Sequence, residues 1–211
     1  MNILGLITAR VDSARVPHKN FQSIAGKPLY KWTTEFLNEN QDCFTALAFS
    51  SDKPERFDVP HNIQKIQRPP DLCKESAVHK DVVIHALDCM EYALNKEFDY
   101  IILFQPTNPF RNTMDLVRLI ALTEEARPAD SYMYYIDDNL KSEYVLGVSM
   151  DSCCNPMIKS GNMYLYGVPY LLGQIPDQEI ITMEIPKWRG YNINTREDFH
   201  VAEALYEANN A

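Results

Sequence analysis

The chain has 211 residues, 45% of them hydrophobic, which is enough to bury a substantial core without stabilising disulfides or metal ions. Its formal net charge of −9 argues against a nucleic-acid-binding protein, which needs a broad basic face to neutralise phosphates. No apolar stretch approaches a membrane span, and the five cysteines form no C-x-x-C pair, so we expect a cytoplasmic protein without membrane partner, disulfide framework or zinc site.

Short apolar runs alternate with stretches of helical periodicity along most of the chain. The expected strands are 2–9, 44–50, 62–66, 100–104 and a short one at 163–166, with less uniformly apolar candidates at 130–136 and 143–150. The expected helices run from Pro28 to about Asn40, from Ser76 to about Leu94, from Asn112 to about Ala126, and from Thr195 onward. Ser76 and Asn112 are the expected N-caps of the second and third helices, and Asp198 completes a capping box with Thr195 in the fourth. Strands that alternate with helices predict an α/β fold with a mostly parallel sheet covered on both faces.

The stretch 131–160 breaks this rhythm. It predicts a small β excursion that extends the sheet, contributes to a substrate site or reaches a partner subunit. Because no linker divides the rest of the sequence, we expect a single domain over residues 1–211.

The segment after the first expected strand is unusually basic. Between residues 10 and 27 one acid, Asp12, stands against four fixed cations: Arg10, Arg15, Lys19 and Lys27. In a parallel α/β sheet, ligands bind beyond the carboxyl ends of the strands, and long loops there are often functional. A solvated surface loop is the competing interpretation, but the position favours a site for a polyphosphate, which arginine and lysine bind well.

The common glycine-rich phosphate motifs do not occur in this chain. The sequence contains neither G-x-G-x-x-G after the first strand nor G-x-x-x-x-G-K-[ST] anywhere. No G-x-S-x-G turn supports a serine hydrolase. If the basic loop binds a polyphosphate, it does so through a motif other than these glycine-rich ones.

Four sequence blocks carry a family resemblance. The run I-T-A-R-V-D-S-A-R-V-P-H-K-N, followed by G-K-P-L, resembles the signature of the acylneuraminate cytidylyltransferases, A-R-x-x-S-x-x-x-P-x-K-N and G-x-P-L. R-P-P-D-L at 68–72, Q-P-T-N-P-F-R at 105–111 and Y-N-I-N-T-R-E-D at 191–198 are similar to three further blocks of that family. The resemblance implies a Rossmann-like, three-layer αβα nucleotidyltransferase fold and an enzyme that transfers CMP from CTP to an acidic keto-sugar.

The resemblance also implies the site residues. A nucleotide site would consist of Arg10, Ser13, Lys19, Asn20, Arg68, Ser76 and His79. Arg10 and Lys19 would be the catalytic cations that offset developing negative charge, and Gln105 would lie between nucleotide and sugar. The implied cofactor is Mg²⁺ at the positions of Asn192 and Asn194, and the implied assembly is a homodimer formed through the β excursion, around 132–136.

Two departures from the family pattern leave alternatives open. Asn192 and Asn194 stand where the family has aspartates that hold Mg²⁺, a metal that prefers charged oxygens. Either triphosphate and water hold the metal, or the protein binds nucleotide without turnover. Between 131 and 160 the only cations are Lys141 and Lys159, so the acceptor is open between sialic acid, another nonulosonate and a 3-deoxy-octulosonate.

Overall fold

A central sheet with helices on both faces makes up the body of the protein. The computed structural model describes residues 1–128, 130–136, 149–150, 156–174 and 180–210. The order of the main strands is β10-β7-β9-β6-β1-β4-β5. Their bounds are β1 Ile3–Thr8, β4 Ala46–Ser51, β5 Ile63–Gln67, β6 Tyr100–Phe104, β7 Asp130–Ile136, β9 Pro156–Gly167 and β10 Ile180–Glu184, and β8 (Ser149–Met150) pairs with β9. Within this order β9 runs antiparallel to both of its neighbours and the other pairs are parallel, so the expected mostly parallel sheet is confirmed.

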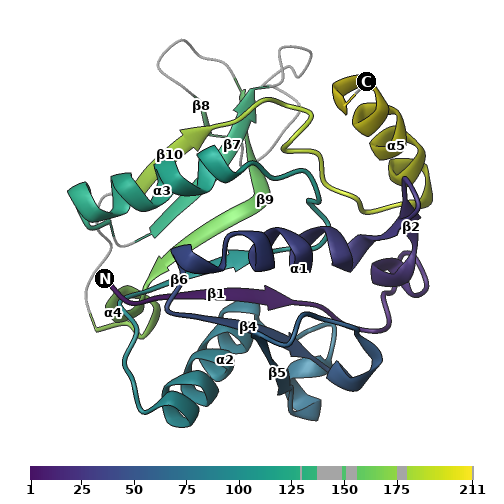
Figure 1. Cartoon of the computed structure of the whole chain (residues 1–211). Helices are drawn as coiled ribbons and strands as arrows, with labels where there is room; N and C mark the ends of the chain where they lie inside the picture. The colour runs from purple at the N-terminus through teal and green to yellow at the C-terminus, as the bar shows by residue number, and fades with distance from the viewer. Residues whose placement is uncertain (129, 137–148, 151–155, 175–179, 211) are drawn as a thin grey trace.

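Alternation of side chains along the strands builds a core on each face of the sheet. In β1, Ile3 and Ile7 face one core while Leu4 and Leu6 face the other, and all four are buried. Helices α1 (Leu29–Glu39) and α3 (Thr113–Ala126) cover the first face, and α2 (His79–Leu94) and α4 (Val168–Leu171) cover the second (Figure 1). The result is the three-layer αβα arrangement expected from the sequence.

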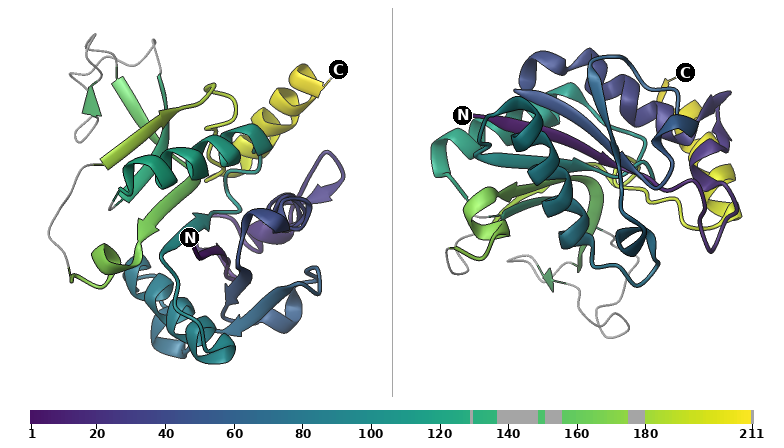
Figure 2. Two further views of the ribbon diagram at one scale, coloured as in Figure 1. Left: turned by 60° about the vertical axis from the view of Figure 1, so that its left-hand side comes forward. Right: turned by 90° about the horizontal axis from the view of Figure 1, so that it is seen from below.

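The last helix, α5 (Arg196–Asn210), covers the loop that follows β1 rather than the sheet. Its buried Phe199 and Ala202 pack with Val16 and Ile24 of that loop in a third apolar cluster. Both views of Figure 2 keep α5 beside this loop. The carboxyl end of β1, the basic loop and the last helix therefore meet at one edge of the molecule, on the right of Figure 1.

Most expected elements are confirmed, with boundary shifts of a few residues. The Asn112 cap is present, because its side chain accepts a hydrogen bond from the Met114 amide at 2.7 Å. The Thr195–Asp198 capping box is present as well, with Thr195 N–H donating to Asp198 Oδ2 at 2.8 Å. The expected strand at 143–150 lies largely outside the described residues, which include only β8 of that segment.

The expected helix start at Ser76 is wrong. Helix α2 begins at His79 and its N-cap position is Val78, which makes no side-chain cap. A turn closed by the Ala77 amide donating to the Lys74 carbonyl takes up Ser76 and delays the helix. Sequence reasoning also missed β10 and a hairpin of β2 (Ser23–Ile24) with β3 (Lys27–Pro28) inside the basic loop.

The excursion at 131–160 is only partly separate from the main sheet. Strand β7 pairs with β10 on one side and β9 on the other, so both of its backbone edges are used within the chain. Residues 137–148 and 151–155 lie outside the described part. The single domain over 1–211 and the role of this stretch in dimerisation or sugar binding stay predictions.

Candidate functional site

The basic loop is an ordered structure. Val16 and Ile24 are fully buried and anchor it, and a short 3-10 helix, Lys19–Phe21, lies between them. The hairpin turn at Ala25 and Gly26 has positive φ at both positions, 49° and 78°, as a tight two-residue hairpin turn requires. The backbone that carries the cations of the loop therefore has a defined conformation.

Arg10 and Asn20 lie together at the start of the loop. The Asn20 side-chain amide, buried to 8% exposure, donates to the Arg10 carbonyl at 2.8 Å. The Arg10 guanidinium donates to the Cys73 carbonyl at 3.0 Å and so ties the loop to the segment before α2. Asn20 thus positions the backbone of Arg10, while Arg10 retains further donors for a ligand.

Lys19 reaches across to the chain just before α5. Its ammonium donates to the Ile193 carbonyl at 3.1 Å. Burial lowers the pKa of Lys19, Arg15 and Arg10 lower it further, and Asp198 opposes them. These effects place Lys19 among two arginines and one acid at the point where the loop after β1 meets the segment before α5.

Arg68 and His79 lie at the carboxyl ends of β4 and β1. Arg68 is 5% exposed and donates from Nε and Nη2 to Ser50, at 3.3 Å to the hydroxyl and 3.0 Å to the carbonyl. The His79 imidazole lies 3.2 Å from the Thr8 hydroxyl at the end of β1. The residue as a whole is exposed, but partial desolvation of its imidazole and the neighbouring Arg68 lower the pKa of His79, so the imidazole is neutral at physiological pH.

The lowered pKa of His79 predicts an acid-sensitive contribution to stability. Below about pH 6.5, an unfolded chain protonates this histidine while the folded chain resists, so the free energy of unfolding falls as the pH drops through that value. We expect His79→Gln to lose less stability on acidification than the native protein in urea denaturation at a series of pH values. The exposed His61→Gln is the control, and identical pH profiles for the native and His79→Gln proteins would contradict the prediction.

The other expected site residues take less central positions. Ser13 is half-buried in the basic loop, and Ser76 is exposed in the turn before α2. Gln105 directly follows β6, whose Phe104 pairs with Ile7 of β1, so Gln105 is level with the end of β1, just before the basic loop begins. The structure thus gathers Arg10, Lys19, Asn20, Arg68 and His79 around the ends of β1 and β4, with Gln105 beside them.

A cluster of buried amides escaped the sequence analysis. Asn108 is fully buried and its side-chain amide donates to the carbonyls of Gly190 and Tyr191, both at 3.0 Å. Asn162 donates in the same way to the carbonyls of Phe110 and Arg189. Together they hold the segment before α5, which supplies the carbonyl that Lys19 contacts.

Arg111 and Gly161 complete this cluster. Arg111 donates to the carbonyls of Gln105 and Asn162, at 2.7 and 2.8 Å, and to the Thr33 hydroxyl. A Cβ atom at Gly161 would lie 2.3 Å from Asn108 Oδ1 and 2.4 Å from Gln105 Oε1, so only glycine leaves room for both side chains. The only sequence signal was that Asn108, Arg111 and Gln105 share one family-like block.

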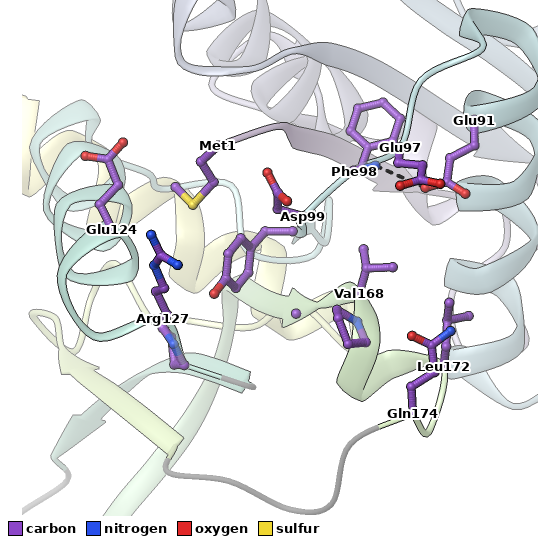
Figure 3. A pocket seen from close by; sticks show the side chains of 14 residues that line it. Met1, Glu91, Glu97, Phe98, Asp99, Glu124, Arg127, Val168, Leu172 and Gln174 are labelled. Carbon is purple, nitrogen blue, oxygen red and sulfur yellow. Dashed lines mark hydrogen bonds between the residues drawn. The ribbon is translucent and has the colours of Figure 1, made fainter.

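A cavity of about 830 Å³ lies at the opposite edge of the sheet (Figure 3). Met1 and Tyr100, at the amino ends of β1 and β6, help to line it. Its charged lining residues are four acids and one cation: Glu91, Glu97, Asp99, Glu124 and Arg127. An acidic lining repels a triphosphate, so this cavity is not part of the candidate site.

The positions implied for a metal do not fit one. Asn192 is exposed, and the Asn194 side-chain oxygen accepts a hydrogen bond from Arg15 at 3.2 Å. Both oxygens of the nearby Asp198 accept hydrogen bonds from the protein. Over the described part of the chain, no group of three or more His, Cys, Asp or Glu side chains is arranged to hold a metal ion. Neutral amides beside a guanidinium are poor ligands for Mg²⁺.

The fold resembles those of solved nucleotide-dependent synthases. A CMP:2-keto-3-deoxy-manno-octonic acid synthetase solved with CTP superposes with a TM-score of 0.71 and 14% identity, covering 99% of this chain and 100% of that one. A 4-diphosphocytidyl-2C-methyl-D-erythritol synthase from Anaerococcus prevotii gives a TM-score of 0.65 and 11% identity, covering 98% and 96%. At these identities the likeness establishes the fold.

Sequence comparison identifies the family. The CMP-N,N'-diacetyllegionaminic acid synthase of Legionella pneumophila is 34% identical over 115 residues, which are 53% of this chain and 48% of that protein, so the match spans about half of the curated relative. No helix in the described residues is both long and apolar enough to span a membrane. The family profile described as cytidylyltransferase matches residues 4–149, well over half of the sequence. The chain belongs to the cytidylyltransferase family.

Proposed function

We propose that this protein transfers CMP from CTP to an acidic keto-sugar and releases pyrophosphate. The single observation that supports this most strongly is the fixed set of cations at the carboxyl end of β1, where Arg10, Arg15 and Lys19 converge on one corner. That corner is where a parallel α/β sheet binds its ligands, and its charge is opposite to that of the protein as a whole.

In the proposed reaction, the anomeric hydroxyl oxygen of the sugar forms a bond to the α-phosphorus of CTP. The bond between that phosphorus and the bridging oxygen breaks, pyrophosphate leaves with the electron pair, and the hydroxyl proton is released. Arg10 and Lys19 are the catalytic cations in this proposal, because they face the triphosphate and offset the charge that develops on the leaving group. Asn20, Ser13, Arg68, Ser76 and His79 bind the nucleotide.

Gln105 is proposed to contact the acceptor sugar. Its carbonyl is held by Arg111 of the loop after β6 and its side chain lies against Gly161 of β9, so its position is set by both segments. We propose a nonulosonate as the acceptor, in line with the Legionella relative, and a 3-deoxy-octulosonate as the alternative within the same class. Homodimer formation and a cytoplasmic location stay predictions from the sequence.

A pyrophosphate-release assay tests the function. The protein would be mixed with CTP, Mg²⁺ and one of three acceptors: sialic acid, a diacetyl-legionaminic acid or a 3-deoxy-octulosonate. Release with any of these acids supports the proposal, and the acceptor with the highest kcat/KM gives the substrate.

The second candidate function is a nucleotide-binding protein that has lost turnover. The observation in its favour is the pair of neutral amides, Asn192 and Asn194, at the positions where the family pattern has carboxylates. Calorimetric binding of CTP without pyrophosphate release from any of the three acids would select it over the enzyme.

A further inference from the structure

The side chain of Asn194 faces a fixed cation. Arg15 Nη1 donates to Asn194 Oδ1 at 3.2 Å, and the two residues are 179 positions apart in the chain. A guanidinium can only donate, so one lone pair of this amide oxygen points at a positive charge. A metal ion could bind this oxygen only through its second lone pair, directly beside that positive charge.

The carboxylate beside Asn194, that of Asp198, is already engaged. Asp198 Oδ1 accepts from the Tyr191 hydroxyl at 2.7 Å, and Oδ2 accepts from the amides of Asn194 and Thr195 at 2.7 and 2.8 Å. Desolvation opposes the charged form, but these hydrogen bonds outweigh it and keep the pKa of Asp198 below its usual value. Its negative charge is therefore used to cap α5 and to fix the segment that contains Asn194.

The backbone between the two amides faces a second cation. Lys19 donates to the Ile193 carbonyl at 3.1 Å, between Asn192 and Asn194 in sequence. Arg15 and Arg10 both lie close enough to lower the pKa of this lysine, after burial itself. The corner thus gathers three positive charges against the carboxylate of Asp198: Arg15 contacts the Asn194 amide, Lys19 contacts the carbonyl between the two asparagines, and Arg10 lies near Lys19. This surplus of positive charge repels a free divalent cation and attracts a polyphosphate.

Resting on the proposed function, we propose that Arg15, held on Asn194, replaces a protein-bound metal ion in this chain, so that fixed side-chain cations bind the triphosphate of CTP. On this basis the polypeptide holds no divalent ion at 192–194, and any Mg²⁺ arrives on the triphosphate with water as its other ligands. The two asparagines are then part of an anion site whose charge balance requires neutral side chains.

The first experiment compares CTP binding by calorimetry in EDTA and in millimolar Mg²⁺. For the native protein, the Kd is expected to change by less than about threefold, which is below 1 kcal/mol in binding free energy. Arg15→Gln is expected to weaken binding in EDTA by about tenfold, the effect of one well-placed phosphate contact. The Arg15 side chain is exposed and belongs to none of the three core clusters, so this variant is expected to retain the fold.

The second experiment changes the charge at the amides. In Asn192→Asp/Asn194→Asp, CTP binding in EDTA is expected to fall by about tenfold or more and to recover in Mg²⁺, because two carboxylates oppose the triphosphate until a metal bridges them. Electron paramagnetic resonance of Mn²⁺ is expected to detect ion binding by the nucleotide-free double variant and none by the native protein. Asn209→Asp, an exposed amide near the far end of α5, is the matched control and is expected to behave as native.

The outcomes separate this inference from the function on which it rests. Mn²⁺ binding by the nucleotide-free native protein, or CTP binding that vanishes in EDTA, would overturn the inference while leaving the cytidylyltransferase in place. An absence of CTP binding under both conditions would defeat the proposed function and the inference together.

Discussion

Lys19→Ala is expected to lower kcat by a factor of about 10²–10³, comparable to the loss of one oxyanion donor in other enzymes. The Lys19 ammonium lies at the meeting point of the basic loop and the segment before α5, where the leaving pyrophosphate would develop charge. Because it contacts only a backbone carbonyl, its removal opens no large cavity in the apolar core. Single-turnover pyrophosphate release measures the effect.

A matched lysine variant separates an effect on catalysis from an effect on the stability of the fold. Lys96→Ala removes an exposed lysine beyond the end of α2, near the edge of the sheet opposite the site, and is expected to leave kcat unchanged. Thermal unfolding of Lys19→Ala is expected to stay close to that of the native protein. Native-like turnover in Lys19→Ala would remove this residue from the mechanism, while a collapse of its thermal stability would show that the lysine is structural.

Asn108→Ala is expected to lower the free energy of unfolding by about 2–4 kcal/mol, because two buried carbonyls lose their shared donor. These carbonyls, of Gly190 and Tyr191, belong to the segment that presents Ile193 to Lys19. The substitution should therefore raise the KM for CTP as well. Urea denaturation and initial-rate kinetics measure the two effects.

Asn40→Ala is the control for the loss of a buried amide. Asn40 is 7% exposed and donates to the Phe36 carbonyl at 2.8 Å, at the end of α1 and outside the site. We expect it to cost about 1 kcal/mol, the net value of one hydrogen bond, and to leave the KM for CTP unchanged. Equal kinetic effects in both variants would mean that Asn108 only stabilises the fold and does not position the segment before α5.

Local sequence patterns were sufficient for most strands of the sheet and most of the helices that cover it, although they missed β10 and placed the start of α2 too early. Continuous apolar runs such as 100–104 predict buried parallel strands because both of their faces lie against helices. The capping box of Thr195 and Asp198 could be predicted from the sequence because its two hydrogen bonds form within four residues. The hairpin at Ala25–Gly26 was harder to see, because alanine at a positive φ is an uncommon turn residue.

The cationic character of the site was also determined by the sequence, since Arg10, Arg15 and Lys19 lie within ten residues after the first strand. The partners of these cations could not be predicted from the sequence. Arg15 meets Asn194 and Lys19 meets Ile193 across more than 170 residues, and Asn108 in the loop after β6 and Asn162 in β9 hold the same segment. Only the order and direction of the strands, including the antiparallel β9, bring these groups together, because hydrogen bonds of 3 Å between remote residues depend on tertiary packing that no local pattern encodes.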